Sequence, residues 1–257
     1  MASSTLVAHK GARIVDASEL DQFPVPPATS TWYPVGHHQV VQEVTGRLGD
    51  AGFMVRRAQH AVMRGECGNA RYFGTLDLES TLVQGVTLAV GIRNSMDKSL
   101  PLGFCAGSRV FVCDNLAFRS ELLVNRKHTR NGQLRFAEAI CQAVQQLSLF
   151  KEQESERIRC LQHAELKDDQ ADALLLRAFE QELVSHRLLP RIIQEWRSPS
   201  FPEFDERTRW SLLNAFTTVL RERHKSNPQQ FAFLTIRIQA LISGEGSPVP
   251  AMIGQAP

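Results

Sequence analysis

Hydrophobic residues recur with different spacings along the chain, and each spacing predicts a different secondary structure. Residues 36–52 carry a valine or leucine every three or four positions, which predicts a short helix that stops at Gly52. The period falls to two over residues 53–126, as in strands that bury one face. From Asn131 to residue 243 the helical spacing returns. The order is therefore a helix, a set of strands and a run of helices.

The strands follow one another closely. Such spacing favours antiparallel pairing, because a parallel crossover needs about a dozen or more residues. Val86–Ile92 is more apolar than the two expected strands before it, as expected of a strand covered on both faces. Strands followed by helices are typical of an α+β fold, here with a mostly antiparallel sheet. The expected strands are Phe53–Met63, Arg71–Leu78, Val86–Ile92, Arg109–Cys113 and Glu121–Arg126.

Composition shifts divide the chain into four regions. Residues 1–35 include a proline-rich segment and predict an extended N-terminal arm, anchored on the body by Trp32 and Tyr33. Residues 36–130 form the sheet region. Residues 131–243 form a helical region packed on the sheet, and residues 244–257 are expected to be a disordered tail.

Bulk composition narrows the class of protein. With 43% hydrophobic and 22% charged residues, the chain is neither fully disordered nor collagen-like. The net charge of +2 means that any binding of nucleic acid must come from local charge separation. The N-terminus has no long apolar run of the signal-peptide kind, and no segment is long enough to span a membrane. We expect a cytoplasmic protein without a membrane partner.

Cysteine and histidine usage argues against a resident metal. The five cysteines include no C-x-x-C pair, whereas structural zinc sites have tight local ligand pairs. Reduced thiols fit a cytoplasmic protein. A Cys113–His128 catalytic pair is weighed against buried thiol, which is favoured. The pair His37–His38 is expected to be solvated or to cap the first helix, and no cofactor is expected.

Charge is segregated along the chain. Eight basic residues outnumber three acidic ones between Arg93 and Arg135, and ten acidic residues outnumber five basic ones between Phe136 and Glu182. In one interpretation the basic stretch neutralises phosphates and nearby phenylalanines stack on bases. In the other, the two stretches neutralise each other and the phenylalanines lie in the core. The candidate nucleic-acid-binding residues are Arg93, Lys98, Arg109, Arg119, Arg126, Lys127, His128, Arg130 and Arg135.

Two polar clusters follow apolar strands, where functional side chains often collect. The motif residues are Asn94, Ser95, Asp97, Asp114 and Asn115. If the clusters meet, Asp97 and Asp114 could hold Mg²⁺ with Lys98 beside a phosphate, as in a metal-dependent nuclease. The favoured alternative is local turn chemistry, in which Asp and Asn bond to their own backbone.

The chain resembles a known family at these motifs. The sequence N-S-x-D-K-S at 94–99, V-C-D-N-L-A-F at 112–118, R-K-H-T at 126–129 and the W-x-L-x-N-A-F-T helix at 210–217 are similar to the phage/plasmid-like proteins of domain-of-unknown-function family 932. The resemblance spans residues 30 to 225 approximately. It implies a prokaryotic or phage origin and carriage on plasmids and prophages. It supplies no activity and no catalytic residue.

These observations favour an accessory protein of mobile elements. We expect it to bind DNA, single-stranded in the first instance, through the basic stretch, as part of a homo-oligomer and without catalysis of its own. Strand annealing is an expectation by fold-level analogy. The alternatives are the nuclease and a protein-interaction module that docks through the acidic helices.

Overall fold

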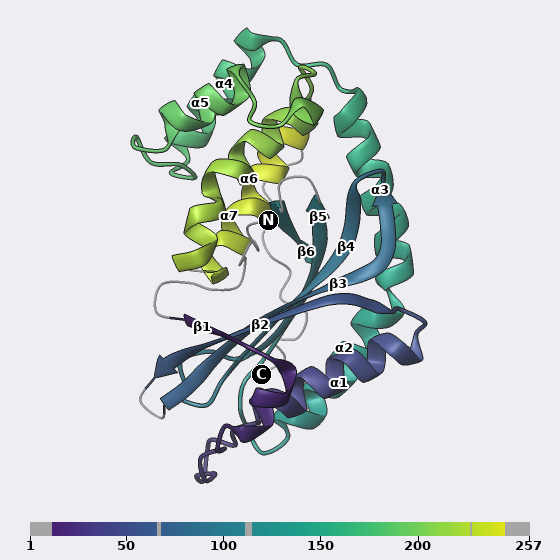
Figure 1. Cartoon of the computed structure of the whole chain (residues 1–257), viewed down its shortest axis with the longest axis vertical. Helices are drawn as coiled ribbons and strands as arrows, with labels where there is room; N and C mark the ends of the chain where they lie inside the picture. Colours follow the sequence, from purple (N-terminus) through teal and green to yellow (C-terminus); the bar gives the residue numbers. More distant parts are fainter. Residues whose placement is uncertain (1–11, 66–67, 111–114, 227, 245–257) are drawn as a thin grey trace.

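The computed structural model describes residues 12–65, 68–110, 115–226 and 228–244, and Figure 1 shows the arrangement of its elements. The sheet region contains β1 (Ala12–Val15), η1 (Ala17–Gln22), α1 (His37–Asp50), β2 (Val55–Gly65), β3 (Gly68–Val83), β4 (Val86–Ser95), β5 (Leu102–Val110) and β6 (Asn115–Arg126). The helical region contains α2 (Gly132–Gln145), α3 (Leu147–His163), α4 (Asp168–Glu180), α5 (Leu189–Arg197), η2 (Pro202–Phe204), α6 (Arg209–Ser226) and α7 (Pro228–Ser243).

Six strands form one antiparallel sheet in the order β1-β2-β3-β4-β5-β6. Each strand therefore pairs with its neighbour in sequence; the connections from β2 to β6 are short, as antiparallel pairing permits, whereas η1 and α1 lie between β1 and β2. The β3–β4 turn contains Gly85 at φ +75°, a conformation that glycine adopts without steric cost. The predicted α+β fold with a mostly antiparallel sheet is confirmed.

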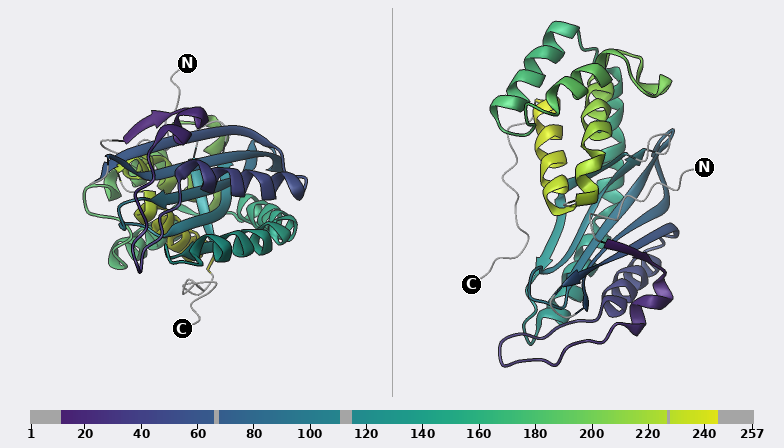
Figure 2. Two further views of the ribbon diagram at one scale, coloured as in Figure 1. Left: turned by 90° about the horizontal axis from the view of Figure 1, so that it is seen from below. Right: turned by 60° about the vertical axis from the view of Figure 1, so that its left-hand side comes forward.

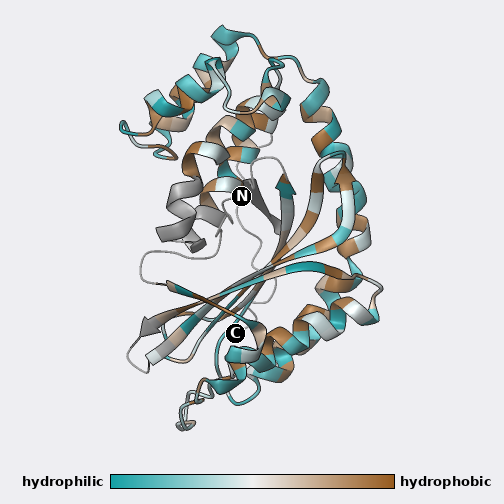
Figure 3. Cartoon of the chain, in the orientation of Figure 1, coloured by the Kyte–Doolittle hydropathy of each residue, from teal (hydrophilic) through white to brown (hydrophobic). Residues whose placement is uncertain are grey.

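Helices lie on both sides of the sheet. Figure 2 shows α1 and α2 on one side and α6 and α7 on the other. We call the side that faces α1 the α1 face; there Tyr72 stacks on His37 of α1 with ring centroids 5.4 Å apart. Alternate residues of each strand point to the opposite face. On that face Phe73, Arg93 and Asn125 lie in one row across β3, β4 and β6, with Gly103 of β5 between the last two. Hydrophobic and hydrophilic residues alternate along the helices in Figure 3.

Several predicted boundaries were wrong. Residues 1–35 are not a single extended arm, because Ala12–Val15 pairs with β2 as an edge strand and the 3-10 helix η1 follows. The fifth strand, β5, begins at Leu102, well before the predicted Arg109. The helical stretch after Asn131 begins with two helices, α2 and α3, separated at Gln146. The next helix, α4, begins at Asp168 and ends at Glu180.

The helical region has its own packing anchor. Trp196 is buried, its indole N–H donates to Asp168 Oδ1 at 3.0 Å, and the Arg207 guanidinium lies 4.9 Å from its ring centroid. Trp196 therefore anchors α5 against α4. Within the described residues, no helix combines the length and the apolar character that crossing a bilayer requires.

Gly74 should be intolerant of a side chain. A Cβ there would overlap the hydroxyl of Tyr72, a fully buried residue. We expect Gly74→Ala to lower the free energy of unfolding by about 1–3 kcal/mol, the usual cost of overpacking. Urea unfolding measures this.

The matched control is Gly46→Ala in α1, where nothing lies within 4 Å of the added Cβ. It should raise the free energy of unfolding by about 0.5–1 kcal/mol, since alanine is the better helix former. Equal effects of the two substitutions would contradict this account of Tyr72.

Candidate nucleic-acid interface

Three segments distant in sequence meet at one end of the sheet. They are the arm at 29–35, the β4–β5 turn at 96–101 and the β6–α2 loop at 127–131, and together we call them the junction. The register pairs Leu102 with Arg126, so the β4–β5 turn and the β6–α2 loop share a sheet end. The arm joins them because the Tyr33 backbone N–H donates to the His128 carbonyl at 2.9 Å. Figure 2 shows the arm passing this end.

Asn94 and Ser95, at the end of β4, hold the junction together. The buried Asn94 amide donates to the Val35 carbonyl at 2.8 Å and lies 3.0 Å from His37 Nδ1. Ser95 Oγ donates to the Leu100 carbonyl at 2.8 Å and accepts from the Leu100 N–H at 2.9 Å. One residue thus fixes the arm and the next closes the turn.

Asp97 is engaged inside the β4–β5 turn. Its carboxylate accepts from Arg71 Nε at 2.8 Å, from the Ser99 N–H at 3.0 Å and from the Ser99 hydroxyl. Burial raises the pKa of Asp97, but the bonds from Ser99 and Arg71 outweigh it, and the pKa lies below its usual value. Asp97 is therefore ionised and neutralised by Arg71, in agreement with the turn interpretation of this motif.

Lys98 and Trp32 form the exposed side of this turn. Lys98 has a positive φ of 65°, which is uncommon for a residue other than glycine. Its ammonium group lies 5.3 Å from the Trp32 ring centroid, within cation–π range. The half-buried Trp32 ring lies 6.5 Å from the His128 ring. An aromatic ring and a cation are thus placed side by side at the surface of the junction.

His128 lies in the interior of the junction. It is buried at 6% exposure, between the arm and the β4–β5 turn. Burial lowers the pKa of His128; backbone groups of Tyr33 and Leu100 favour protonation but do not reverse the shift. The prediction that His128 adds to a phosphate-binding surface is therefore corrected: the ring is neutral and enclosed.

The exposed cations of the junction have no salt bridge among the residues that the structure describes. Lys98, Lys127 and Arg130 are exposed, and Arg126 is half-buried beside them in sequence. Asp97, the one acidic residue within the three segments, is already paired with Arg71. Exposed Arg135 lies in the first turn of α2, where the helix dipole disfavours a positive charge. Helix stability does not explain a cation there.

Arg109 does not belong to this surface. The side chain is fully buried, with Nε 2.8 Å from Asp77 Oδ1 and Nη2 donating to Thr75 Oγ1 at 3.2 Å. Its prediction as a phosphate contact is corrected, because an enclosed ion pair presents no charge to a ligand. Phe104 is also buried, as the core interpretation predicted. Phe111 and the side chains of Arg119 and Phe118 lie outside the described residues.

The two polar clusters of the sequence lie at opposite ends of β5. Asn115 pairs with Val110, whereas the turn containing Asp97 precedes Leu102 at the other end. Nine residues of strand separate the ends by about 26 Å at about 3.3 Å per residue. Asp114 and Cys113 themselves lie outside the described residues. Among the residues described, no three His, Cys, Asp or Glu side chains are grouped to hold a metal ion.

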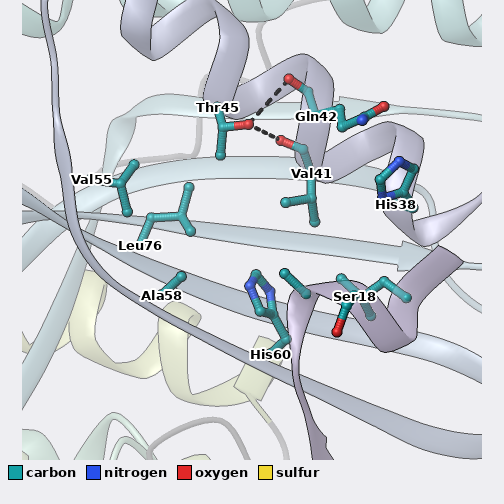
Figure 4. A pocket seen from close by; sticks show the side chains of 11 residues that line it. Ser18, His38, Val41, Gln42, Thr45, Val55, Ala58, His60 and Leu76 are labelled. Carbon is teal, nitrogen blue, oxygen red and sulfur yellow. Dashed lines mark hydrogen bonds between the residues drawn. The ribbon is translucent and has the colours of Figure 1, made fainter.

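A crevice of about 380 Å³ lies between α1, η1 and the first strands (Figure 4). The sequence did not indicate it, because its walls come from four separated elements. Mostly apolar side chains line it: Ala17, Ser18, Leu20, His38, Val41, Gln42, Thr45, Val55, Ala58, His60 and Leu76.

Behind this crevice, Tyr72 stacks between two histidines. Its ring centroid lies 5.4 Å from that of His37 and 5.9 Å from that of His60, and its hydroxyl lies 2.8 Å from His60 Nδ1. Burial raises the pKa of Tyr72 and lowers that of His60. Both groups are therefore neutral near pH 7. His37 is 1% exposed, which corrects its prediction as a solvated or capping residue.

No protein family, curated protein or solved structure matches this chain. The resemblance to the phage/plasmid-like family accordingly stays a prediction.

Acidification should weaken the fold before the carboxylates titrate. Burial lowers the pKa values of His60 and His128 in the folded protein. Below about pH 6.5 these histidines therefore bind protons in the unfolded chain but remain neutral in the folded chain. The free energy of unfolding should be level above pH 7. Between pH 6.5 and 5.5 it should fall by up to about 1.4 kcal/mol per pH unit for each such histidine. Urea unfolding at several pH values measures it.

Two variants test whether the buried histidines cause this decrease of the free energy of unfolding with falling pH. His128→Asn should reduce it, whereas His186→Gln, at an exposed residue, should leave it unchanged. A stability that is constant or rising as the pH falls from 6.5 to 5.5 would rule out the two buried neutral histidines.

Proposed function

We propose that the protein binds single-stranded nucleic acid at the junction and acts as an accessory protein of a mobile genetic element. The observation that carries this proposal is the convergence of exposed Lys98, Lys127 and Arg130 at one sheet end, where the one local acid is neutralised internally. No catalytic step is part of it. The nuclease is not proposed, since Asp97 is engaged and remote from Asn115.

The charge distribution suits a localised phosphate contact. Cations that neutralise phosphates release condensed counterions, which gives affinity that declines with salt. Because the net charge is only +2, attraction must come from the junction itself. The acid-rich stretch 136–182 would repel a polyanion and confine it to the basic end.

Half-buried Trp32 and Tyr33 favour a single strand over a duplex. Unpaired bases can stack on aromatic rings, and such stacking tolerates any base. Lys98 beside Trp32 would place a phosphate contact next to a stacking contact. A homo-oligomer, also part of the proposal, would align several junctions along one strand.

Charge reversal at the junction should abolish most of the affinity. The double variant Lys127→Glu and Arg130→Glu replaces two exposed cations. We expect at least a tenfold weaker binding of labelled oligo-dT at low salt. The slope of log affinity against log salt should fall by about 0.7 for each lost phosphate contact. Fluorescence anisotropy measures both quantities.

The control changes the net charge equally at a distant place. Arg187→Glu with Arg191→Glu alters two exposed arginines in and before α5. This variant should bind as the wild type does. The proposal fails if the wild type does not bind at low salt, or if both double variants lose affinity alike.

A further inference from the structure

Arg93 differs from the other arginines in or near the interior. Arg109 pairs with Asp77, Arg71 with Asp97 and Arg157 with Glu154, so each has a carboxylate partner. Arg93 is largely buried, yet it has no acidic partner among the described residues.

The contacts of Arg93 leave most of its donors available. Nη2 donates to Asn125 Oδ1 at 2.6 Å, while Nε and Nη1 have no partner within the described part of the chain. A guanidinium has five N–H donors, and this contact uses one of them. Burying a cation without a counterion is costly, and proteins generally offset the cost with an anion.

The backbone holds the Arg93 side chain flat across the sheet. Arg93, Gly103 and Asn125 are aligned on β4, β5 and β6 by the register. A Cβ on Gly103 would lie 2.5 Å from Arg93 Cγ and 2.6 Å from Nε. The side chain therefore crosses β5 where only glycine permits it, and Asn125 fixes its far end. The guanidinium is oriented before any ligand arrives.

The electrostatic surroundings favour an anion from outside. Burial lowers the pKa of Arg93, but arginine remains protonated at neutral pH. Among the described residues, Cys105 is the titratable group that favours the charged form of Arg93, but it supplies no counterion, since burial raises the pKa of its thiol to about 12. The positive charge is thus neither removed nor neutralised by its neighbours.

We propose that Arg93, oriented by Asn125 and accommodated by Gly103, binds one anionic phosphate group of a ligand. A planar guanidinium matches the oxygens of a phosphate, which accept from two N–H groups at once. Half-buried Phe73, the register partner of Arg93 on β3, lies on the same face and offers an apolar surface beside it. This anion site lies on the face opposite Asn94 and Tyr72, and it does not depend on the proposed function of the junction.

Asn125→Asp is the sharpest test, because it changes almost no volume and supplies the missing carboxylate. Inorganic phosphate is titrated at constant ionic strength while the Arg93 Nε–Hε NMR resonance is followed. The wild type should show a saturable shift, and Asn125→Asp should weaken phosphate binding at least tenfold. No saturable shift in the wild type, or an unchanged affinity in Asn125→Asp, would overturn the site.

Two further variants test the site if Asn125→Asp does not fold. Gly103→Ala keeps the cation but displaces its side chain, and Arg93→Gln removes the charge. Ligand that binds only the folded state raises the unfolding midpoint, and phosphate also stabilises proteins generally. The phosphate-dependent rise should therefore be larger in the wild type than in either variant. Equal rises in all three proteins would also overturn the site.

Titrations with oligo-dT and with acetate show which kind of ligand carries the anionic group that binds Arg93. If Asn125→Asp weakens binding of both phosphate and oligo-dT, the phosphate belongs to the strand. If it weakens phosphate alone, the ligand is a small phosphorylated compound. If acetate shifts the Arg93 resonance as strongly as phosphate does, the restriction to phosphate is overturned. The Lys127 and Arg130 variant should bind inorganic phosphate normally, so failure of the junction would leave this site testable.

Discussion

The arrangement of the junction depends on one buried amide. Asn94 is enclosed at the end of β4, and an unpaired amide there would cost about 1–3 kcal/mol. Its NH₂ group is satisfied by Val35, in the arm, and lies beside His37, in the first turn of α1. This contact sets where the arm meets the sheet, and so where Tyr33 can reach the His128 carbonyl. A strand end thereby fixes a segment 59 residues away in sequence.

Burial divides the cations of the basic stretch into three groups. Arg109 is enclosed with Asp77 and stabilises the sheet without facing a ligand. Lys98, Lys127 and Arg130 remain at the surface, and Asp97, the acid next to Lys98 in sequence, is paired with Arg71. Arg93 is largely enclosed and lacks a carboxylate among the described residues. The basic stretch of the sequence therefore divides in the structure into a buried ion pair, a set of surface cations and the arginine for which we propose an anion site.

Periodicity predicted the sheet and the helices because one covered face imposes a regular alternation of residues. It missed β1, whose four residues are too few to show a period, and it missed the start of β5, where Gly103 and Gly107 interrupt the pattern. Periodicity could not predict the pairing of Arg109 with Asp77, because these residues are brought together by the register of the strands. For the same reason, only the structure distinguishes Arg93 from its neighbours. Turn chemistry at Asp97 was predictable, because aspartate commonly bonds to the backbone two residues later.

We propose that three separate segments form one surface for single-stranded nucleic acid. Hydrogen–deuterium exchange of the backbone amides, measured with and without saturating oligo-dT at low salt, tests this proposal. Exchange should slow together in residues 29–35, 96–101 and 127–131, with little change in α4 and α5. Slowing confined to α4 and α5, or to a single one of the three segments, would contradict it.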